Sequence, residues 1–487
     1  MDDQRRLIAS LGLPVIETHI SYVLFDRGTV YKIKKAVRFP FLDFTTLASR
    51  EFYCREELRL NGRLAPSIYL DVVPITGTVD APIIGPANGA GAIEYAVRMR
   101  EFDQNGLLSR VIARDELTSE RVDALAVEVA AFHERTARAG GGLPYGQPDG
   151  ILEDARQNFS AMAGLEATDI TLIDALREWT EREGARCAGA FVARKQQGCV
   201  RECHGDLHLG NIALVDGAIT LFDCIEFNPA MRWIDVMSDV AFLVMDLRDR
   251  NRPDLAARFL NVYLERTGDY AGLDVLRFYI VYRALVRAKI ARLRLAQTAP
   301  GGERDTLTRE FRTYLDLALR ETSPARPSVV ITHGVAGSGK STRAQALVDA
   351  GAVAIRSDVE RKRLRGLRPD ARTGSDTGAG LYTAEINRQT YDRLAALART
   401  IVAAGYTVVV DATFLKRAQR DLFRAVANEL RVPFVIADCT APVPVLQERV
   451  ARRHARGRDP SEATLDVLAQ QLASQEPLGP DELEWRT

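Results

Sequence analysis

A glycine-rich segment, Gly334-Val-Ala-Gly-Ser-Gly-Lys-Ser341, has the residue types and spacing that surround a chain of phosphate groups. It satisfies the pattern G-x-x-x-x-G-K-[ST], follows an apolar stretch and opens a predicted helix, which is the context in which this pattern binds phosphate. Backbone N–H groups would surround the phosphate oxygens, with Lys340 on the β/γ-phosphates and Ser341 on Mg²⁺. The other predicted nucleotide-binding residues are Gly334, Gly337, Ser338, Gly339 and Thr342.

Two aspartates follow predicted strands that should end at the same sheet edge as this segment. Asp411 ends the apolar run 406–410 and is a candidate for the acid that binds a water of the Mg²⁺ ion or orders water beside it. Asp358 follows the run 352–356 and could accept a proton from a substrate hydroxyl. Either aspartate could instead be a helix N-cap.

An arginine-rich segment at 447–459 could place several cations over a transferring phosphoryl group. Its arginines recur at three- and four-residue spacings, so at least three share one helical face. Such a lid would stabilise the transferring charge, and the candidates are Arg449 and Arg453, with Arg452 and Arg456 beside them. The alternative is a solvated basic helix.

A second set of polar residues, His204-Gly-Asp206 followed by Asn211, has the spacing H-x-D-x-x-x-x-N of the catalytic loop in protein-kinase-like enzymes. Asp206 would orient or deprotonate an acceptor hydroxyl, and Asn211 would bind Mg²⁺. A predicted hairpin then leads to Asp223, where the main Mg²⁺ carboxylate is expected. His208 and Glu226 remain open between structural hydrogen bonding and support of this site.

Lysine is scarce in this chain, with eight lysines against 57 arginines, so each lysine marks a place where a compact ammonium could be needed. Three of them, Lys32, Lys34 and Lys35, lie on or beside a predicted strand. A kinase fold needs one strand lysine on the nucleotide phosphates and a helix glutamate to hold it. We choose Lys32, with Lys34 as the alternative. Glu57 is favoured as its partner over Glu56 or Glu51, and a solvated basic strand is the remaining possibility.

Length and composition describe an ordinary globular chain. The 487 residues balance 65 Lys+Arg against 65 Asp+Glu, which gives no general reason to expect a nucleic-acid or membrane partner. No apolar run reaches the ~18 residues that span a bilayer, and the charged start does not resemble a signal peptide. The six cysteines form no C-x-x-C pair. We therefore expect a cytoplasmic protein with reduced thiols.

The pattern of elements predicts two domains joined near residue 325, where prolines and small polar residues follow a long helical stretch. Residues 1–324 should form a two-lobed domain, with a small β-rich lobe (about 1–100) and a helical lobe (about 101–320). In residues 325–487, strands at 328–332, 352–356, 406–411 and 432–437 alternate with helices starting near 341, 382, 416, 443 and 462. Such α/β alternation predicts a parallel sheet sandwiched by helices.

The second region resembles the P-loop kinase family of polynucleotide 5′-hydroxyl kinases, zeta-type toxins and gluconate-type kinases, and most closely the predicted kinases labelled AAA-type ATPase domains. The resemblance rests on Gly334–Ser341 and on the arginine-rich lid. It also rests on Arg356-Ser-Asp358 with Arg361 and Lys362, and on residues 409–413 with Arg417 and Arg420. The resemblance implies a kinase, since about 160 residues are too few for a motor ATPase. The loop 366–380 departs from the well-studied members.

The first region resembles the aminoglycoside phosphotransferase-like family, which shares the kinase fold and phosphorylates small-molecule hydroxyls. The match covers roughly 20–320 and is strongest at 202–239. A full G-x-G-x-x-G loop is missing, with only Gly28 in a probable hairpin, and no Phe-Gly follows Asp223. These departures disfavour a protein substrate. The order of the modules resembles a class of fused phosphotransferase-like and P-loop kinase proteins.

Together these features predict a bifunctional phosphotransferase with two ATP·Mg²⁺ sites that transfers the γ-phosphate to hydroxyls of small molecules. One alternative is that one module senses nucleotide, or is a degenerate kinase, and regulates the other. A further alternative is 5′-hydroxyl polynucleotide kinase activity in the second module, with nucleic acid as its partner. The acceptor and the oligomeric state do not follow from these residues.

Overall fold

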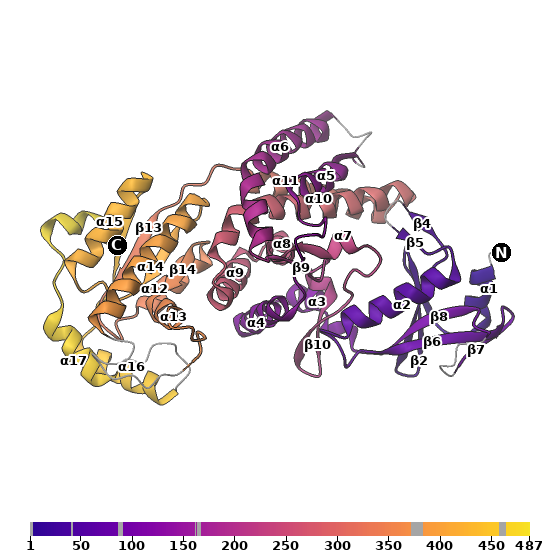
Figure 1. The fold of residues 1–487 in the computed structure, drawn as a ribbon, viewed down its shortest axis with the longest axis horizontal. Coiled ribbons are helices and arrows are strands. Elements are labelled where there is room, and N and C mark those ends of the chain that lie inside the picture. Colours follow the sequence, from indigo (N-terminus) through magenta and orange to yellow (C-terminus); the bar gives the residue numbers. More distant parts are fainter. Residues whose placement is uncertain are drawn as a thin grey trace. The chain divides into compact units, whose positions relative to one another are not determined.

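A computed structural model of the chain describes residues 3–39, 42–85, 91–160, 162, 167–371, 383–456 and 464–487, without the side chains of 167–168 and 453–456. Its contacts divide it into two compact units, which are described separately below (Figure 1). The first comprises Met1–Ala124, Ala131–Asp154 and Phe191–Asp246, and the second comprises Leu125–Ala130, Ala155–Ala190 and Leu247–Thr487. Among the described residues, no helix is both long and apolar enough to cross a membrane.

The small lobe of the first unit is an antiparallel sheet with the strand order β1-β2-β3-β8-β6-β7. Helix α2 lies along β6 and β8 (Figure 1), where Cys54 packs against Tyr69 and Val97. Thr46 begins this helix by accepting a hydrogen bond from the Ser49 N–H (3.1 Å). The elements of the lobe are α1 (Asp3–Ser10), β1 (Val15–Glu17), β2 (Ser21–Asp26), β3 (Thr29–Lys34), β4 (Arg38–Phe39), β5 (Leu42–Asp43), α2 (Leu47–Asn61), β6 (Tyr69–Thr78), β7 (Ala81–Ile84) and β8 (Glu94–Arg100).

Short strands and helices follow the small lobe and carry the predicted catalytic loop between β9 and β10. The β10–β11 hairpin pairs Ile212 with Leu221, which brings the chain back beside that loop. Four longer helices, α4, α5, α6 and α8, have residues in both units. The elements are α3 (Leu108–Ala113), α4 (Ser119–Arg135), α5 (Pro148–Ser160), α6 (Ala167–Gln196), β9 (Val200–Glu202), β10 (Ile212–Val215), β11 (Ala218–Leu221), α7 (Pro229–Arg232), β12 (Trp233–Asp235) and α8 (Val236–Asp249).

The second unit contains a four-stranded parallel sheet with the order β14-β15-β13-β16. Helices α14 and α15 cover one face, while α12 and α9 pack on the other. Ala257 of α9 shares a buried cluster with Val330, Val348 and Val409. The elements are α9 (Pro253–Thr267), α10 (Leu273–Gln297), α11 (Gly302–Glu321), β13 (Val329–His333), α12 (Lys340–Asp349), β14 (Val353–Arg356), α13 (Ser357–Arg363), α14 (Ala384–Ala403), β15 (Val408–Asp411), α15 (Arg417–Leu430), β16 (Phe434–Asp438), α16 (Val443–Arg456), α17 (Leu465–Ser474) and η5 (Pro480–Trp485).

The predicted fold class is confirmed, with a kinase-like α+β region followed by a parallel α/β sheet sandwiched by helices. The four predicted strands of the second region begin and end within two residues of the observed ones. The sequence did not predict the short helix α13, which begins directly after β14. Most of the predicted loop 366–380 lies outside the described residues, and the domain boundary near 325 stays a prediction.

Candidate active sites

Strand β3 and helix α2 bring a lysine, a glutamate and an aspartate together in the first unit. The Lys32 ammonium nitrogen lies 2.7 Å from Glu57 Oε1 and 2.7 Å from Asp223 Oδ1. Burial alone would lower the pKa of Lys32, but the carboxylates of Asp223 and Glu57 raise it well above its usual value. The lysine therefore stays charged, as a phosphate-binding cation must.

The second lysine of the same strand face, Lys34, binds the other oxygen of Glu57 (2.7 Å) and also Glu226. Its side chain is completely buried, whereas 15% of the Lys32 side chain is exposed. Burial would raise the pKa of Glu57, but Lys32 and Lys34 lower it to about 2. Of the two lysines, only Lys32 faces both Glu57 and the predicted Mg²⁺ ligand Asp223, so it is the better placed for phosphate.

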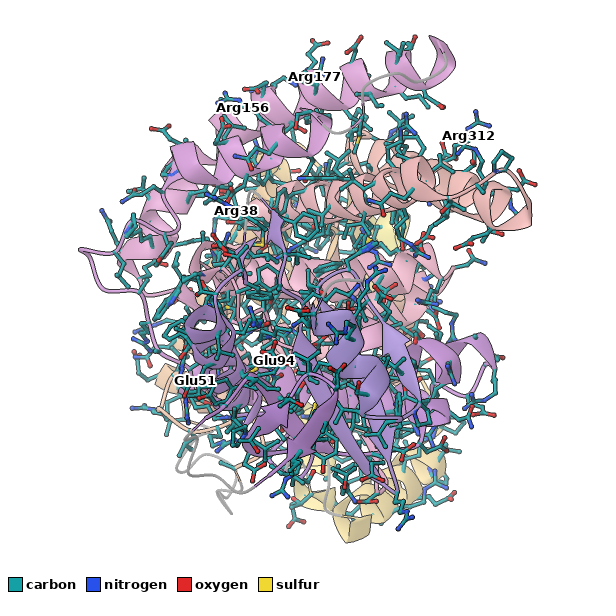
Figure 2. All side chains as sticks on the ribbon, turned by 90° about the vertical axis from the view of Figure 1, so that its right-hand side faces the viewer. Arg38, Glu51, Glu94, Arg156, Arg177 and Arg312 are labelled. Carbon is teal, nitrogen blue, oxygen red and sulfur yellow. The ribbon has the colours of Figure 1, made fainter. Side chains whose placement is uncertain are left out.

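The two other glutamates considered as partners of the phosphate-binding lysine, Glu51 and Glu56, pair with arginines instead. Glu51, labelled in Figure 2, pairs with Arg55 one turn along α2 (2.7 Å). Glu56 accepts hydrogen bonds from Arg59 (2.9 Å) and pairs with Arg232 (3.3 Å). Glu57 thus has the contacts predicted for the phosphate-lysine partner.

The segment 204–211 folds so that its polar groups converge. Asn211 Nδ2 donates to the carboxylate and to the backbone carbonyl of Asp206, both at 3.0 Å. His208 Nε2 lies 3.4 Å from the Asp206 carboxylate, which places this histidine beside the predicted catalytic acid. His204 is buried, and its Nε2 lies within hydrogen-bonding distance of the Phe222 carbonyl (2.9 Å). This contact is structural, because it links the loop to the end of the β10–β11 hairpin.

Two residues that the sequence did not single out hold the loop that carries Asp223. The backbone N–H of Asp223 donates to the Tyr69 hydroxyl (3.2 Å), and the N–H of Cys224 donates to Asn61 Oδ1 (2.9 Å). Asp223 has a φ of +63°, a conformation that non-glycine residues adopt uncommonly. Asn61 follows Glu57 by one helical turn, so its place on the same face of α2 was a usable signal.

In the second unit the glycine-rich segment forms a tight loop between β13 and α12. Gly334, Gly337 and Gly339 have φ values of +136°, +80° and +104°. A Cβ on Gly334 would lie 2.3 Å from the Cys439 carbonyl oxygen, and one on Gly337 would lie 2.9 Å from that of Leu446. The loop therefore requires glycine at these two positions.

The predicted metal-binding pair of this loop is in direct contact. Ser341 Oγ donates to Asp411 Oδ2 at 2.9 Å, at the carboxyl ends of β13 and β15. Lys340 Nζ donates to the Val335 carbonyl (2.8 Å), so its ammonium lies over the loop. The hydroxyl of Ser338 is buried without a hydrogen-bond partner among the described residues. An orphaned donor, a charged lysine and a hydroxyl–carboxylate pair fit a nucleotide phosphate chain with Mg²⁺.

Asp358 lies on the first turn of α13 and pairs with Arg361 at 2.7 Å. Arg356 occupies the N-cap position, so Asp358 is not the cap that the sequence left open. Arg356 Nε also lies 3.8 Å from Asp411.

One described arginine of the arginine-rich helix α16 donates a hydrogen bond to the glycine-rich loop. Arg449 Nη1 donates to the Gly337 carbonyl at 3.2 Å. Arg452 instead lies 3.8 Å from Glu448, and the side chains of Arg453 and Arg456 lie outside the described residues. Arg449 is thus the described lid arginine in contact with the loop.

Two further arginines bind the C-terminal segment. Arg420 is buried and binds both carboxylate oxygens of Glu482 (2.6 and 2.8 Å), and Arg417 binds Asp481 (3.0 Å). These contacts give both arginines a structural role in holding η5 against α15.

Two family models match separate regions of the chain. Residues 53–279 match the model described as "Phosphotransferase enzyme family", and residues 329–478 match one described as "AAA domain". An uncharacterized protein of Mycobacterium tuberculosis is 30% identical over 467 residues, covering 95% of this chain and 90% of the relative. The chain belongs to the same family as this relative.

Solved kinase structures are similar to parts of this chain. Plasmodium vivax ethanolamine kinase covers 64% of this chain and 84% of its own, with 10% identity and a TM-score of 0.39. A sugar kinase from Janibacter sp. HTCC2649 covers 32% and 82%, with 25% identity and a TM-score of 0.24. The family matches identify the chain as a phosphotransferase of the kinase type.

Proposed function

We propose that this chain has two ATP·Mg²⁺ sites, each of which transfers the γ-phosphate to a hydroxyl group of a small molecule. The observation that carries the proposal is the pair of contacts from Lys32 to Glu57 and Asp223, beside the linked Asp206 and Asn211. A purely structural ion-pair network would not need the acid–amide pair of Asp206 and Asn211. The contact between Ser341 and Asp411 supports the second site in the same way.

At the first site, Lys32 would bind the α/β-phosphates while Glu57 holds its ammonium in place. Asn211 and Asp223 would hold Mg²⁺, which neutralises charge on the phosphate oxygens when it is bound. Asp206 would accept the proton of the acceptor hydroxyl as the hydroxyl oxygen forms its bond to phosphorus and the bond to ADP breaks. His208, 3.4 Å from Asp206, would hold that carboxylate in position.

At the second site, the loop Gly334–Ser341 would bind the triphosphate through backbone N–H groups and Lys340. Ser341 and Asp411 would hold Mg²⁺. Asp358 would accept the acceptor proton, and Arg449 would stabilise the transferring charge, with Arg453 as the other predicted lid residue. The domain boundary near 325 would then separate two catalytic modules.

The proposal is tested by transfer from γ-labelled ATP to sugars, aminoglycosides, nucleotide sugars and oligonucleotides. We expect D206A and K340A each to abolish labelling of a different acceptor, with losses of about 10²–10⁴-fold. D216N, at an exposed aspartate in the β10–β11 turn, is the matched control and should leave both rates unchanged. Failure of the wild-type chain to bind nucleotide at either site would refute the proposal.

A regulatory role of one module is a second candidate, and contacts of helix α9 favour it. Glu265, within the matched phosphotransferase region, lies 3.8 Å from Arg356, which in turn lies 3.8 Å from Asp411. Nucleotide titration of D206A and K340A distinguishes the candidates. A regulatory site would bind nucleotide and change the transfer rate at the other site. It would itself transfer no phosphate to any acceptor tested.

A further inference from the structure

A cavity of about 390 Å³ lies in the second unit, at the amino ends of strands β14 and β15. The glycine-rich loop and Asp411 lie at the carboxyl ends of the sheet, so the cavity is at the opposite edge from the proposed nucleotide site. Its walls are Arg277 of α10, Leu347 of α12 and the segments 325–327, 350–352 and 405–407. No residue of the proposed catalytic machinery belongs to it.

The charge of this cavity is positive. Arg277 and Arg326 line it, and none of the described residues in its wall is acidic. Within the described parts of the chain, neither arginine has a hydrogen bond or an ion pair. The acidic residues nearby are already used, since Glu321 binds Arg248 (2.5 Å) and Glu183 binds Arg186 (2.9 Å). Two guanidinium groups are thus left without a counter-charge.

The wall beside Arg277 is open because residue 405 is a glycine. Gly405 has a φ of +87°, and a Cβ there would lie 3.1 Å from Arg277 Nη2 and 3.1 Å from Ala325 Cβ. A side chain at this position would therefore require the Arg277 guanidinium and Ala325 to shift slightly. The absence of a side chain at Gly405 therefore leaves room for the Arg277 guanidinium.

We propose that this cavity binds a small polyanion with two adjacent oxyanion groups, such as a diphosphate or a tricarboxylate. The planar fork of arginine matches the oxygens of phosphate and carboxylate, and two such forks fit two groups. The volume is within the range of small-molecule sites. This site is additional to the two proposed nucleotide sites. It lies between α10 and the amino ends of the strands.

The test uses the full chain carrying K32M and K340M, which disables both proposed nucleotide sites, so the result does not depend on them. Pyrophosphate and citrate are titrated by calorimetry. We expect one binding event, weakened about tenfold or more by adding R277M and by adding R326M, because each removes charge-assisted hydrogen bonds. R294M is the matched control, since Arg294 is an exposed arginine on the same helix, outside the cavity, and should leave the affinity unchanged.

Modification of the unmutated chain with phenylglyoxal gives a second measurement that needs no variant to fold. Pyrophosphate should protect Arg277 and Arg326, and leave Arg294 reactive, as read by peptide mass spectrometry. Binding of one probe but not the other would identify the ligand class as phosphate or carboxylate. Equal affinity in the R277M and R326M chains, no binding of either probe, or no protection would overturn the proposal.

Discussion

At the scale of residues, the first site is built on two lysines that share one glutamate. Each carboxylate oxygen of Glu57 binds one of them, Lys32 and Lys34. Lys34 is fully buried and also binds Glu226, three residues after Asp223, so it connects β3, α2 and the loop that carries Asp223. Arginine would not fit this network without rearrangement, because its side chain is longer and its planar fork directs hydrogen bonds differently from a compact ammonium.

Removal of the two lysines should have different consequences. K34M leaves Glu226 and one oxygen of Glu57 buried without a counter-charge, so we expect a loss of about 3–5 kcal/mol in the free energy of unfolding. K32M leaves Glu57 still paired with Lys34, so we expect a smaller loss of stability but no phosphate transfer at the first site. Urea unfolding and labelled transfer measure the two effects. Equal destabilisation by both variants would contradict this division of roles.

Acid should unfold the first unit through Glu57. Its pKa is about 2 in the folded chain against 4.5 for an unperturbed glutamate. Because the folded pKa is depressed, the stabilisation is fully present above about pH 4.5 and is lost as the pH falls towards 2. We expect the unfolding free energy of the wild type to fall more steeply than that of E57Q between pH 5 and pH 3. Parallel pH curves for the two proteins would show that Glu57 is not responsible.

At the scale of elements, helix α9 hydrogen-bonds the edge of the parallel sheet through the side chain of Asn261. Asn261 Nδ2 donates to the Ala352 carbonyl (3.1 Å), and its Oδ1 accepts from the Ala354 N–H (2.7 Å). These are the kinds of bonds that an adjacent strand would make with β14. The same helix contributes Ala257 to the core beneath the sheet. A helix within the matched phosphotransferase region thus binds backbone groups at the edge of the sheet that carries the glycine-rich loop.

N261A should therefore destabilise the second unit. The substitution removes the side-chain amide that bonds the Ala352 carbonyl and the Ala354 N–H, and we expect a cost of about 1–3 kcal/mol. N428A, at an exposed asparagine of α15, is the control and should cost less than about 0.5 kcal/mol. Thermal unfolding measures both variants. An unchanged N261A protein would mean that water satisfies the edge of β14 equally well.

At the scale of the whole molecule, each compact unit contains the described residues of one proposed site. Lys32, Glu57, Asp206, Asn211 and Asp223 all lie in the first unit, and the glycine-rich loop with Asp358 and Asp411 lies in the second. The second unit begins long before residue 325, because α9, α10 and α11 belong to it. The division by contacts therefore differs from the division by family match.

Hydrogen exchange of the full chain should reveal this division. Units that open cooperatively share one opening free energy. We expect amides of α9 to exchange together with those of β13 and β15, and separately from those of β2, β3 and β8. Adding MgATP should protect amides around the glycine-rich loop. Exchange of α9 together with the small-lobe sheet would contradict the assignment of this helix to the second unit.

The sequence by itself predicted the candidate site residues and most of the elements that carry them. The spacings of Gly334–Ser341 and of His204–Asn211 predicted the residues that the structure brings together, because such patterns depend on local backbone geometry. Alternation placed Lys32 and Lys34 on one strand face, and both do reach Glu57. Strand positions in the second region followed from apolar runs bounded by glycine and polar residues.

Only the tertiary structure distinguished residues that the sequence pattern leaves equivalent. Lys32 and Lys34 cannot be told apart by pattern, since their difference is burial and the position of Asp223, 191 residues away. Arg417 and Arg420 belong to a motif, yet both bind carboxylates of the C-terminal segment. The packing of α9 on the sheet and the cavity at Arg277 depend on contacts between segments distant in the chain. Local spacing carries no information about such contacts, because they are fixed by packing of the whole core.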